Sequence, residues 1–341
     1  LLLLIITLYL LEDYLNNNSN KLYFLPIVSI VFINFHASIW PMMFIFCMPF
    51  VAELLYLYYK KKDKRLFKLI IIMFISIITA FINPYGREAL LYSFYSYGNP
   101  LINNTIAEMH HFTLNYKMYS ATCTSLLILG IVIVNVVFLY KNYKKYPIHY
   151  YFFLGGLSLM AFLTLRNVSF LLIGTLPFIV LNFNKKMKSK LPLKVYLIPL
   201  VLILLIYGFN CFQGYYTLRN TTVNKIVNYL DKNANKKAII FTGFNEGPYF
   251  EYKGYKVYMD SRAEVFLKKN NHKEEIFNEY NDVYNGKVDY DKFIFKYKFT
   301  HLVVYKKSPL HKYLKRNNDY VNTCHQKDIY LYEKRDYSKS E

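Results

Sequence analysis

The sequence contains little cysteine and lacks the short motifs that mark common catalytic and metal-binding sites. Only four cysteines stand among 341 residues. Cys47 and Cys123 lie in apolar segments, where a thiol is expected to be buried as a small hydrophobic group. No Cys/His cluster with metal-ligand spacing, P-loop, nucleophile elbow or dinucleotide fingerprint occurs along the chain. No metal ligands can therefore be assigned from the sequence.

Acidic residues are scarce relative to basic ones. The chain has 42 Lys and Arg residues against 22 Asp and Glu, a formal net charge of +20. Such an excess can indicate nucleic-acid binding, but no recognition motif accompanies it. The lysines instead cluster at the ends of apolar segments, as they do beside the cytoplasmic ends of membrane spans. The charge pattern favours a lipid bilayer over nucleic acid as the partner.

The chain is rich in long apolar runs, and 54% of its residues are hydrophobic. Unbroken runs of about twenty residues match a hydrocarbon core of roughly 30 Å. The chain begins inside such a run, Leu1–Leu11, without Met or the basic segment of a signal peptide. We therefore expect that the chain is truncated, with its true N-terminus upstream and its first span partial.

Residues 1–210 are predicted to form a polytopic α-helical membrane domain with about seven to eight spans. The apolar segment 22–59 would be about 57 Å long as one helix, so it must break. Pro41 can begin a helix but lacks the N–H needed inside one, which places the break between His36 and Pro41. The predicted spans are residues 1–11, 22–36, 41–59, 66–83, 119–140, 148–165, 168–183 and 193–210.

The orientation follows from three basic loops, which begin at Lys60, Lys141 and Lys185. Placing these loops in the cytoplasm gives an alternating path that leaves the residues after about 210 on the outer side. Glu53 lies inside a span near the first basic loop. We expect it to reach the cytoplasmic interface or pair with a lysine, and do not assign it to a functional site.

Residues 211–341 are predicted to form a soluble extracytoplasmic α/β domain. Helical and strand patterns alternate there, which is typical of a three-layer fold with a mainly parallel sheet. The predicted helices are 222–232, 273–284, 290–297 and 309–316, and the predicted strands are 238–242, 255–259, 301–305 and 329–333. Cys211 and Cys324 both lie in this domain, where a disulfide is permitted, but the sequence does not show that their Cα atoms approach.

Several polar residues gather at the predicted outer ends of the spans. They are Asn34, His36, Asn83, Glu108, His110, His111 and Arg166. Each taken alone is explained by capping or anchoring at the interface, but their convergence on one face favours a functional site there. Adjacent histidines cannot face the same way on a helix, so His110 and His111 make a poor metal pair.

Two further segments allow both a structural and a functional interpretation. Residues 89–97 of the long outer loop 84–118 have an apolar face beside tyrosines, typical of an interfacial helix. Such a helix either shapes a groove for a lipid-linked substrate or simply anchors the loop. Asp260 and Arg262 follow a predicted strand, where open α/β sheets bind ligands. An ion pair that fixes the loop is the favoured interpretation for these two residues.

The polar segments together resemble a known family. Asn34–Ser38, Asn83–Gly86 and Leu165–Phe170 on the outer side, with Asn245–Tyr249 and Val257–Arg262 in the exported domain, carry the resemblance. In order and spacing they resemble membrane glycosyltransferases of the GT-C type, most closely the uncharacterised bacterial members. Ser261 stands at the position of the glycine in that group's Asp-Gly-Arg segment.

The resemblance implies an integral protein of a bacterial plasma membrane that serves the cell envelope. It would transfer a sugar from a polyprenyl-phosphate donor to a glycan, lipid or protein acceptor on the extracytoplasmic face. An inverting transfer needs a carboxylate base, for which Glu108 is the candidate, and groups that hold the phosphate, here Arg166, His36 and Asn34. In such enzymes the catalytic acidic residue, which acts as the base, usually lies in the first outer loop. On that pattern the base and any divalent metal bound with it are expected upstream of Leu1.

Two other functions remain open from the sequence. One is a non-catalytic assembly or transport protein with the same fold, and the other is a polysaccharide polymerase or ligase. A transporter is expected to show internal repeats or broken helices in matching halves, and the sequence shows neither. An acidic pair upstream would favour the glycosyltransferase.

Overall fold

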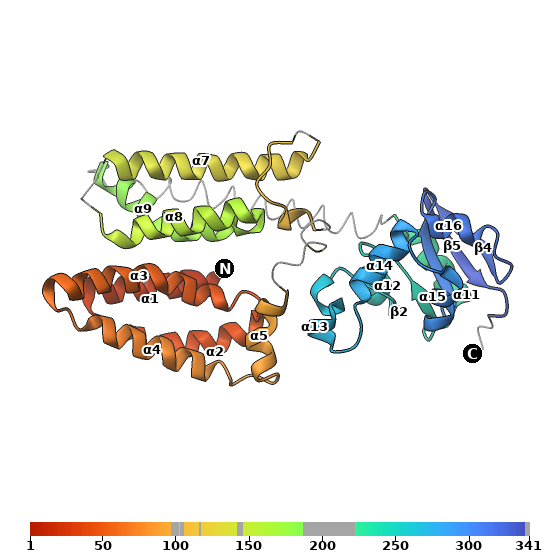
Figure 1. Cartoon of the computed structure of the whole chain (residues 1–341), viewed down its shortest axis with the longest axis horizontal. Helices are drawn as coiled ribbons and strands as arrows, with labels where there is room; N and C mark the ends of the chain where they lie inside the picture. The colour runs from red at the N-terminus through yellow and green to blue at the C-terminus, as the bar shows by residue number, and fades with distance from the viewer. Residues whose placement is uncertain (97–101, 103–105, 116, 142–145, 187–221, 338–341) are drawn as a thin grey trace. The chain divides into compact units, whose positions relative to one another are not determined.

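The computed structural model describes residues 1–96, 102, 106–115, 117–141, 146–186 and 222–337, which fall into two compact units, Leu1–Lys190 and Leu191–Glu341 (Figure 1). Each unit has its own hydrophobic core. The predicted domain boundary near residue 210 and the predicted span 193–210 lie outside the described residues.

The first unit is helical. Its helices are α1 (Leu2–Asn17), α2 (Leu25–His36), α3 (Pro41–Lys61), α4 (Arg65–Thr79), α5 (Arg87–Ser96), α7 (Tyr119–Lys141), α8 (Ile148–Leu163) and α9 (Val168–Lys186), with short 3-10 turns η1 (Asn20–Phe24), η2 (Ala107–Met109) and η3 (Leu165–Asn167). The predicted break between His36 and Pro41 is confirmed, and Pro41 is the first residue of α3. The helix predicted over residues 89–97 lies within α5 as far as Ser96, and residue 97 is outside the described residues.

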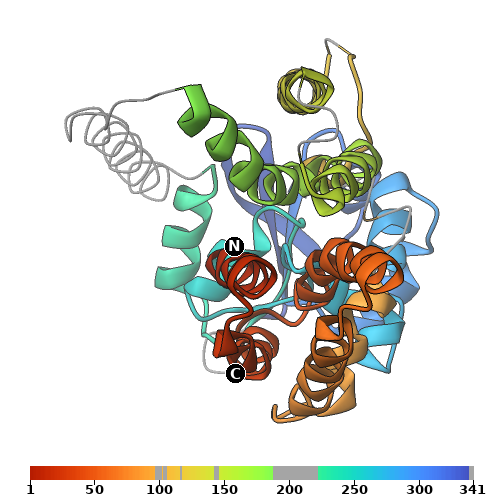
Figure 2. The same cartoon turned by 90° about the vertical axis from the view of Figure 1, so that its left-hand side faces the viewer.

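Helix α3 lies at the centre of the first unit and packs against α1, α4 and α8. Its Phe46 and Phe50 are fully buried and meet Phe153 of α8 edge to face, with ring centroids 5.5 and 5.7 Å apart. Figure 2 views several of these helices end-on, so that their roughly parallel axes can be followed. The buried aromatic contacts make the helices of the first unit one packed body.

The outer surface of the first unit is strongly apolar. Large hydrophobic side chains stay exposed along α4 and α7, among them Ile71, Phe74, Ile78, Leu126 and Ile133. By length and composition two described helices can cross a membrane, Pro41–Lys61 and Ser120–Lys141. Core helices of soluble proteins can have the same length and composition. Membrane insertion therefore remains a prediction.

The second unit contains a five-stranded mixed sheet. Its strands are β1 (Ile239–Phe241), β2 (Lys256–Val257), β3 (His301–Tyr305), β4 (Tyr320–Gln326) and β5 (Ile329–Lys334). In the order β2-β1-β3-β5-β4, β1 is parallel to β2 and β3, whereas β5 is antiparallel to β3 and β4. The prediction of a mainly parallel sheet is wrong, because it missed β4. Only Lys327 and Asp328 separate β4 from β5, and so short a connection joins antiparallel strands.

Helices cover both faces of this sheet, which gives the three layers that were expected. On one face lie α11 (Asn224–Asn233) and α12 (Gly247–Tyr252), and on the other lie α14 (Ile276–Asn285), α15 (Tyr290–Tyr297) and α16 (Pro309–Leu314). The turn η4 (Ala263–Phe266) and the short helix α13 (Lys268–Asn271) follow β2. Cys324 is a buried free cysteine on β4, and Cys211 lies outside the described residues.

Candidate functional site

Two of the predicted site residues, Glu108 and Arg166, form an ion pair at one end of the helical unit. The Glu108 Oε1 atom lies 3.6 Å from the Arg166 Nη1 atom, with 59% and 34% of the side chains exposed. Glu108 belongs to η2 and Arg166 to η3, the turn between α8 and α9. A partly exposed pair of this kind keeps both charges within reach of a ligand from solvent.

Backbone hydrogen bonds hold the outer loop across the end of α8. The Phe112 N–H donates to the Phe162 carbonyl, and the Leu165 N–H donates to the His110 carbonyl, both at 3.0 Å. The Phe112 and Phe162 rings meet edge to face at 5.1 Å. These contacts place the loop that carries Glu108 beside the turn that carries Arg166.

The histidines of this loop have different surroundings. His111 is exposed, and its Nδ1 lies 2.6 Å from the Leu163 carbonyl oxygen, so a ring N–H donated there anchors the loop to α8. His110 is half-buried, and its backbone carbonyl accepts the hydrogen bond from the Leu165 N–H. Neither contact directs both rings toward a shared ligand. Among the described residues, no group of three or more His, Cys, Asp and Glu side chains is placed to hold a metal ion.

Asn34 and Asn83 lie together, but their amides are bonded to backbone. The Asn34 side chain donates to the Ile82 carbonyl at 2.8 Å, joining the end of α2 to the segment after α4. The Asn83 amide donates to the Ala80 carbonyl at 2.7 Å, and its oxygen accepts from the Tyr85 N–H. The His36 Nδ1 lies 2.9 Å from the Ser38 hydroxyl. These contacts support a structural role for the two asparagines.

Both groups of residues lie at the same end of the helical unit. In Figure 1, α2, α4 and α8 end on the same side, and these ends carry His36, Asn83 and the turn that contains Arg166. The hydroxyl of Ser93 on α5 donates to the Ser38 carbonyl at 2.8 Å, so α5 is held at this end as well. Of the residues predicted for the site, the structure brings Glu108 and Arg166 together as an ion pair at this end of the unit.

The sequence missed a buried charged cluster at the opposite end of α8. Glu53 was expected to reach the cytoplasmic interface or to pair with a lysine. It is instead buried, and its carboxylate accepts a hydrogen bond from the His149 backbone N–H at 3.2 Å. The His149 Nε2 lies 3.2 Å from Glu12 Oε1. This cluster joins α1, α3 and α8, because an imidazole between two carboxylates satisfies charges that would be costly to bury alone. The presence of Glu53 and His149 in apolar segments was the signal available in the sequence.

Asp260 and Arg262 form an ion pair beside the edge strand β2. The buried Asp260 carboxylate accepts from the Arg262 backbone N–H at 2.7 Å and from its guanidinium, which also reaches Glu251 at 3.0 Å. Burial by itself raises the pKa of Asp260, but the hydrogen bonds from Arg262 outweigh it and leave that pKa below its ordinary value. The arrangement ties the loop after β2 to α12, which agrees with the structural interpretation.

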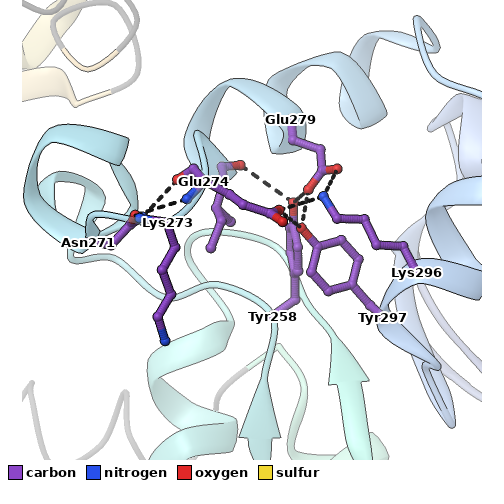
Figure 3. Close-up of polar contacts among 8 residues, drawn as sticks. Tyr258, Asn271, Lys273, Glu274, Glu279, Lys296 and Tyr297 are labelled. Atoms are coloured by element: carbon purple, nitrogen blue, oxygen red, sulfur yellow. Dashed lines mark hydrogen bonds and ion pairs between the residues drawn. The ribbon is translucent and has the colours of Figure 1, made fainter.

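A second charged network joins α14 and α15 to the end of β2 (Figure 3). The Lys296 Nζ lies 2.5 Å from Glu274 Oε2 and 2.9 Å from Glu279 Oε1. The hydroxyls of Tyr258 and Tyr297 both donate to Glu279. The Lys296 ammonium lowers the pKa of Glu274 through its hydrogen bond and charge. Because each charge already has a partner, this network stabilises the domain and does not form a vacant site.

No family model, curated protein or solved structure matches this chain. The functional conclusion therefore depends on the residues and their geometry.

Proposed function

We propose that this chain is an integral membrane protein whose first unit spans a bilayer and whose second unit lies on the extracytoplasmic side. The exposed apolar side chains along α4 and α7 support insertion, since such a surface is costly in water. In the second unit the large apolar side chains that stay exposed among the described residues are few, namely Tyr252, Val265, Tyr284, Phe295 and Val321. The lysine-rich loops support the orientation.

Within that setting, the proposed activity is the transfer of a sugar from a polyprenyl-phosphate donor to an acceptor hydroxyl. The ion pair between Glu108 and Arg166 is the observation that carries this proposal. A carboxylate can take the proton from an acceptor hydroxyl, and a guanidinium can bind two phosphate oxygens at once. Both side chains lie at the end of the helical unit that is proposed to face outward, which supports these two roles.

The chemistry is an inverting displacement. The Glu108 carboxylate removes the acceptor proton as the acceptor oxygen attacks the anomeric carbon. The bond between that carbon and the phosphate oxygen breaks, and its electrons leave with the polyprenyl phosphate, whose charge Arg166 stabilises. Donor phosphate would compete with Glu108 for Arg166 and so free the carboxylate to act as a base. Among the described residues no group of His, Cys, Asp and Glu side chains fits a metal site, and the proposed steps use none.

The test is sugar transfer in membrane vesicles with a panel of polyprenyl-phosphate sugars. Glu108→Ala and Arg166→Ala should each lower the rate by about a hundredfold or more, the usual size of a lost general base or oxyanion contact. Glu88→Ala and Arg87→Ala are the matched controls, since these residues form an exposed ion pair at 3.4 Å. The control variants should keep the parental rate.

A charge-swapped double variant separates catalysis from structure. Combining Glu108→Arg with Arg166→Glu preserves an ion pair but exchanges the base with the cation. If the ion pair is only structural, the charge swap should restore the activity that the single variants lose. Recovery of activity in the charge-swapped variant, or full activity in both alanine variants, would contradict the proposed site and favour a non-catalytic membrane protein.

A further inference from the structure

The soluble unit has a topological feature that the sugar-transfer proposal does not use. β1 lies between β2 and β3 in the sheet. The chain passes from β1 to β2 on one side of β1, and later returns to form β3 on the other side of β1. After β1 the chain enters α12 on one face, and after β3 it enters α16 on the opposite face. In open α/β sheets, loops that diverge in this way leave a crevice at the carboxyl ends of the two strands.

A pocket lies at this position. Its wall contains Gly243 after β1, Tyr305 and Ser308 at the end of β3, and Tyr280 and Tyr284 of α14. The pocket is half open and has a volume of about 20 Å³, enough for one water-sized group. Tyr284 is 54% exposed and forms the rim. The pocket is therefore an aromatic hollow that can admit one small polar group and support a larger one outside.

A buried carboxylate lies directly behind this wall. Glu246 is only 8% exposed, and its Oε1 accepts a short hydrogen bond from the Tyr305 hydroxyl. A Cβ atom at Gly243 would come within 2.4 Å of Glu246 Oε2, so glycine allows the carboxylate to lie against the pocket wall. Within the described part of the chain, no basic side chain forms an ion pair with Glu246, and its Oε2 accepts no hydrogen bond.

The tyrosine hydroxyls add hydrogen-bonding capacity. Tyr280 accepts from the Phe244 N–H at 3.1 Å, but its own proton has no acceptor among the described residues. The Tyr284 hydroxyl makes no hydrogen bond in the same part of the chain. Burial and the Glu246 carboxylate raise the pKa of Tyr305, so its hydroxyl stays protonated and keeps donating. The site thus combines a carboxylate acceptor with hydroxyls that can both donate and accept.

We propose that this crevice binds a sugar residue, with one sugar hydroxyl in the pocket and the apolar face of the ring against Tyr284. A sugar offers several hydroxyl donors to a carboxylate without carrying a charge, and its C–H face suits an aromatic ring. An ammonium group is the competing ligand chemistry, since aromatic rings and a carboxylate also attract cations. Within the second unit Lys and Arg outnumber Asp and Glu, and this positive charge disfavours a cationic ligand. This inference concerns binding by the second unit and does not depend on sugar transfer by the first.

The test is saturation-transfer NMR on the full chain in lipid nanodiscs, which avoids sugar-based detergents. The probes are the methyl glycosides of glucose, galactose, mannose and N-acetylglucosamine, with tetramethylammonium as the cationic probe. We expect at least one glycoside to bind. Tyr284→Ala and Glu246→Gln should each weaken its binding by about tenfold or more, roughly the effect of one lost hydrogen bond or stacking contact.

Tyr252→Ala is the matched control, because Tyr252 is also an exposed tyrosine but lies on α12, on the opposite face of the sheet. It should leave binding unchanged. Tyr284→Ala removes an exposed ring and should not disturb the fold, which near-ultraviolet circular dichroism checks. Absence of binding by every glycoside, binding that survives both Tyr284→Ala and Glu246→Gln, or binding of tetramethylammonium alone would each overturn the proposal.

Discussion

Single ionisable residues of the second unit show how burial and partners act against each other. Asp260 and Glu274 keep their charges, because Arg262 and Lys296 donate to them. His301 has no such charged partner among the described residues and is 1% exposed on β3. Its Nδ1 lies 2.9 Å from the Thr300 hydroxyl oxygen, and its ring packs against Tyr337. The neutral form of its imidazole is therefore favoured in the fold.

His301 should make the second unit less stable in acid. Burial lowers its pKa to about 4, below the ordinary value of about 6.5. The unfolded chain then binds the proton more readily, so stability is complete above about pH 6.5 and falls as the pH approaches 4, by on the order of 3 kcal/mol. NMR titration of ¹³C-labelled histidines, with the signal assigned by His301→Gln, measures the pKa. Titration of His301 near its ordinary value would contradict the prediction.

Asp260 should be required for the loop after β2. Asp260→Ala removes a buried acceptor of both the backbone and the guanidinium of Arg262, which should cost about 1–3 kcal/mol. Glu251→Ala removes only the exposed half of the same ion-pair network and should cost less than about 1 kcal/mol. Pulse proteolysis in urea measures both changes. Equal losses in the two variants would show that burial of Asp260 is not decisive.

At the scale of elements, the contact between α12 and the end of β2 depends on one glycine. A Cβ atom at Gly247 would lie 2.0 Å from the Met259 carbonyl oxygen, which is backbone and cannot rotate away. Gly247 is also the first residue of α12 and is itself buried. The close approach lets α12 pack beside the loop that carries Asp260. The short helix α12 was not predicted from the sequence, because its six residues carry no helical period.

Gly247→Ala should therefore disrupt the second unit, with a loss of stability above about 2 kcal/mol. Gly130→Ala is the matched control, because no atom lies within 4 Å of a Cβ built there in the middle of α7. The control should be neutral or stabilising by up to about 1 kcal/mol, given the better helix propensity of alanine. The yield of folded protein and its protease resistance distinguish the two. A tolerated Gly247→Ala would mean that α12 can shift away from β2.

At the scale of the whole molecule, the proposed orientation places the lysine-rich loops and the soluble unit on opposite sides of a bilayer. Lys64 and Lys315 are both exposed and suit single-cysteine labelling in a chain without its native cysteines. A membrane-impermeant maleimide should label Lys315→Cys in intact cells, but Lys64→Cys only after permeabilisation, because the reagent cannot cross the lipid. Labelling of both variants from the same side would contradict the proposed topology.

The sequence alone determined the elements that depend on local pattern. Apolar runs located the helices of the first unit, and Pro41 marked the break between α2 and α3, since proline suits a first helical turn and disfavours later ones. Alternating helical and strand patterns identified β1, β3, α15 and most of the other elements of the second unit. Strand β4 was missed, because its residues do not alternate regularly between apolar and polar and its pairing with β5 shifts register between Asn322 and Cys324. Without β4 the direction of β5 was open, and the sheet was predicted to be mainly parallel.

Tertiary structure decided which polar residues meet. The sequence placed Asn34, Asn83, Glu108 and Arg166 at one end of the helices. Only the packed structure shows that the two asparagine amides donate to backbone carbonyls, whereas Glu108 and Arg166 form an ion pair. It also brings Glu53 to His149, and Glu246 to Tyr305, over separations that no local pattern encodes. The physical reason is that hydrophobic burial selects which faces of the helices and strands pack together. The partners of a polar side chain then follow from that packing.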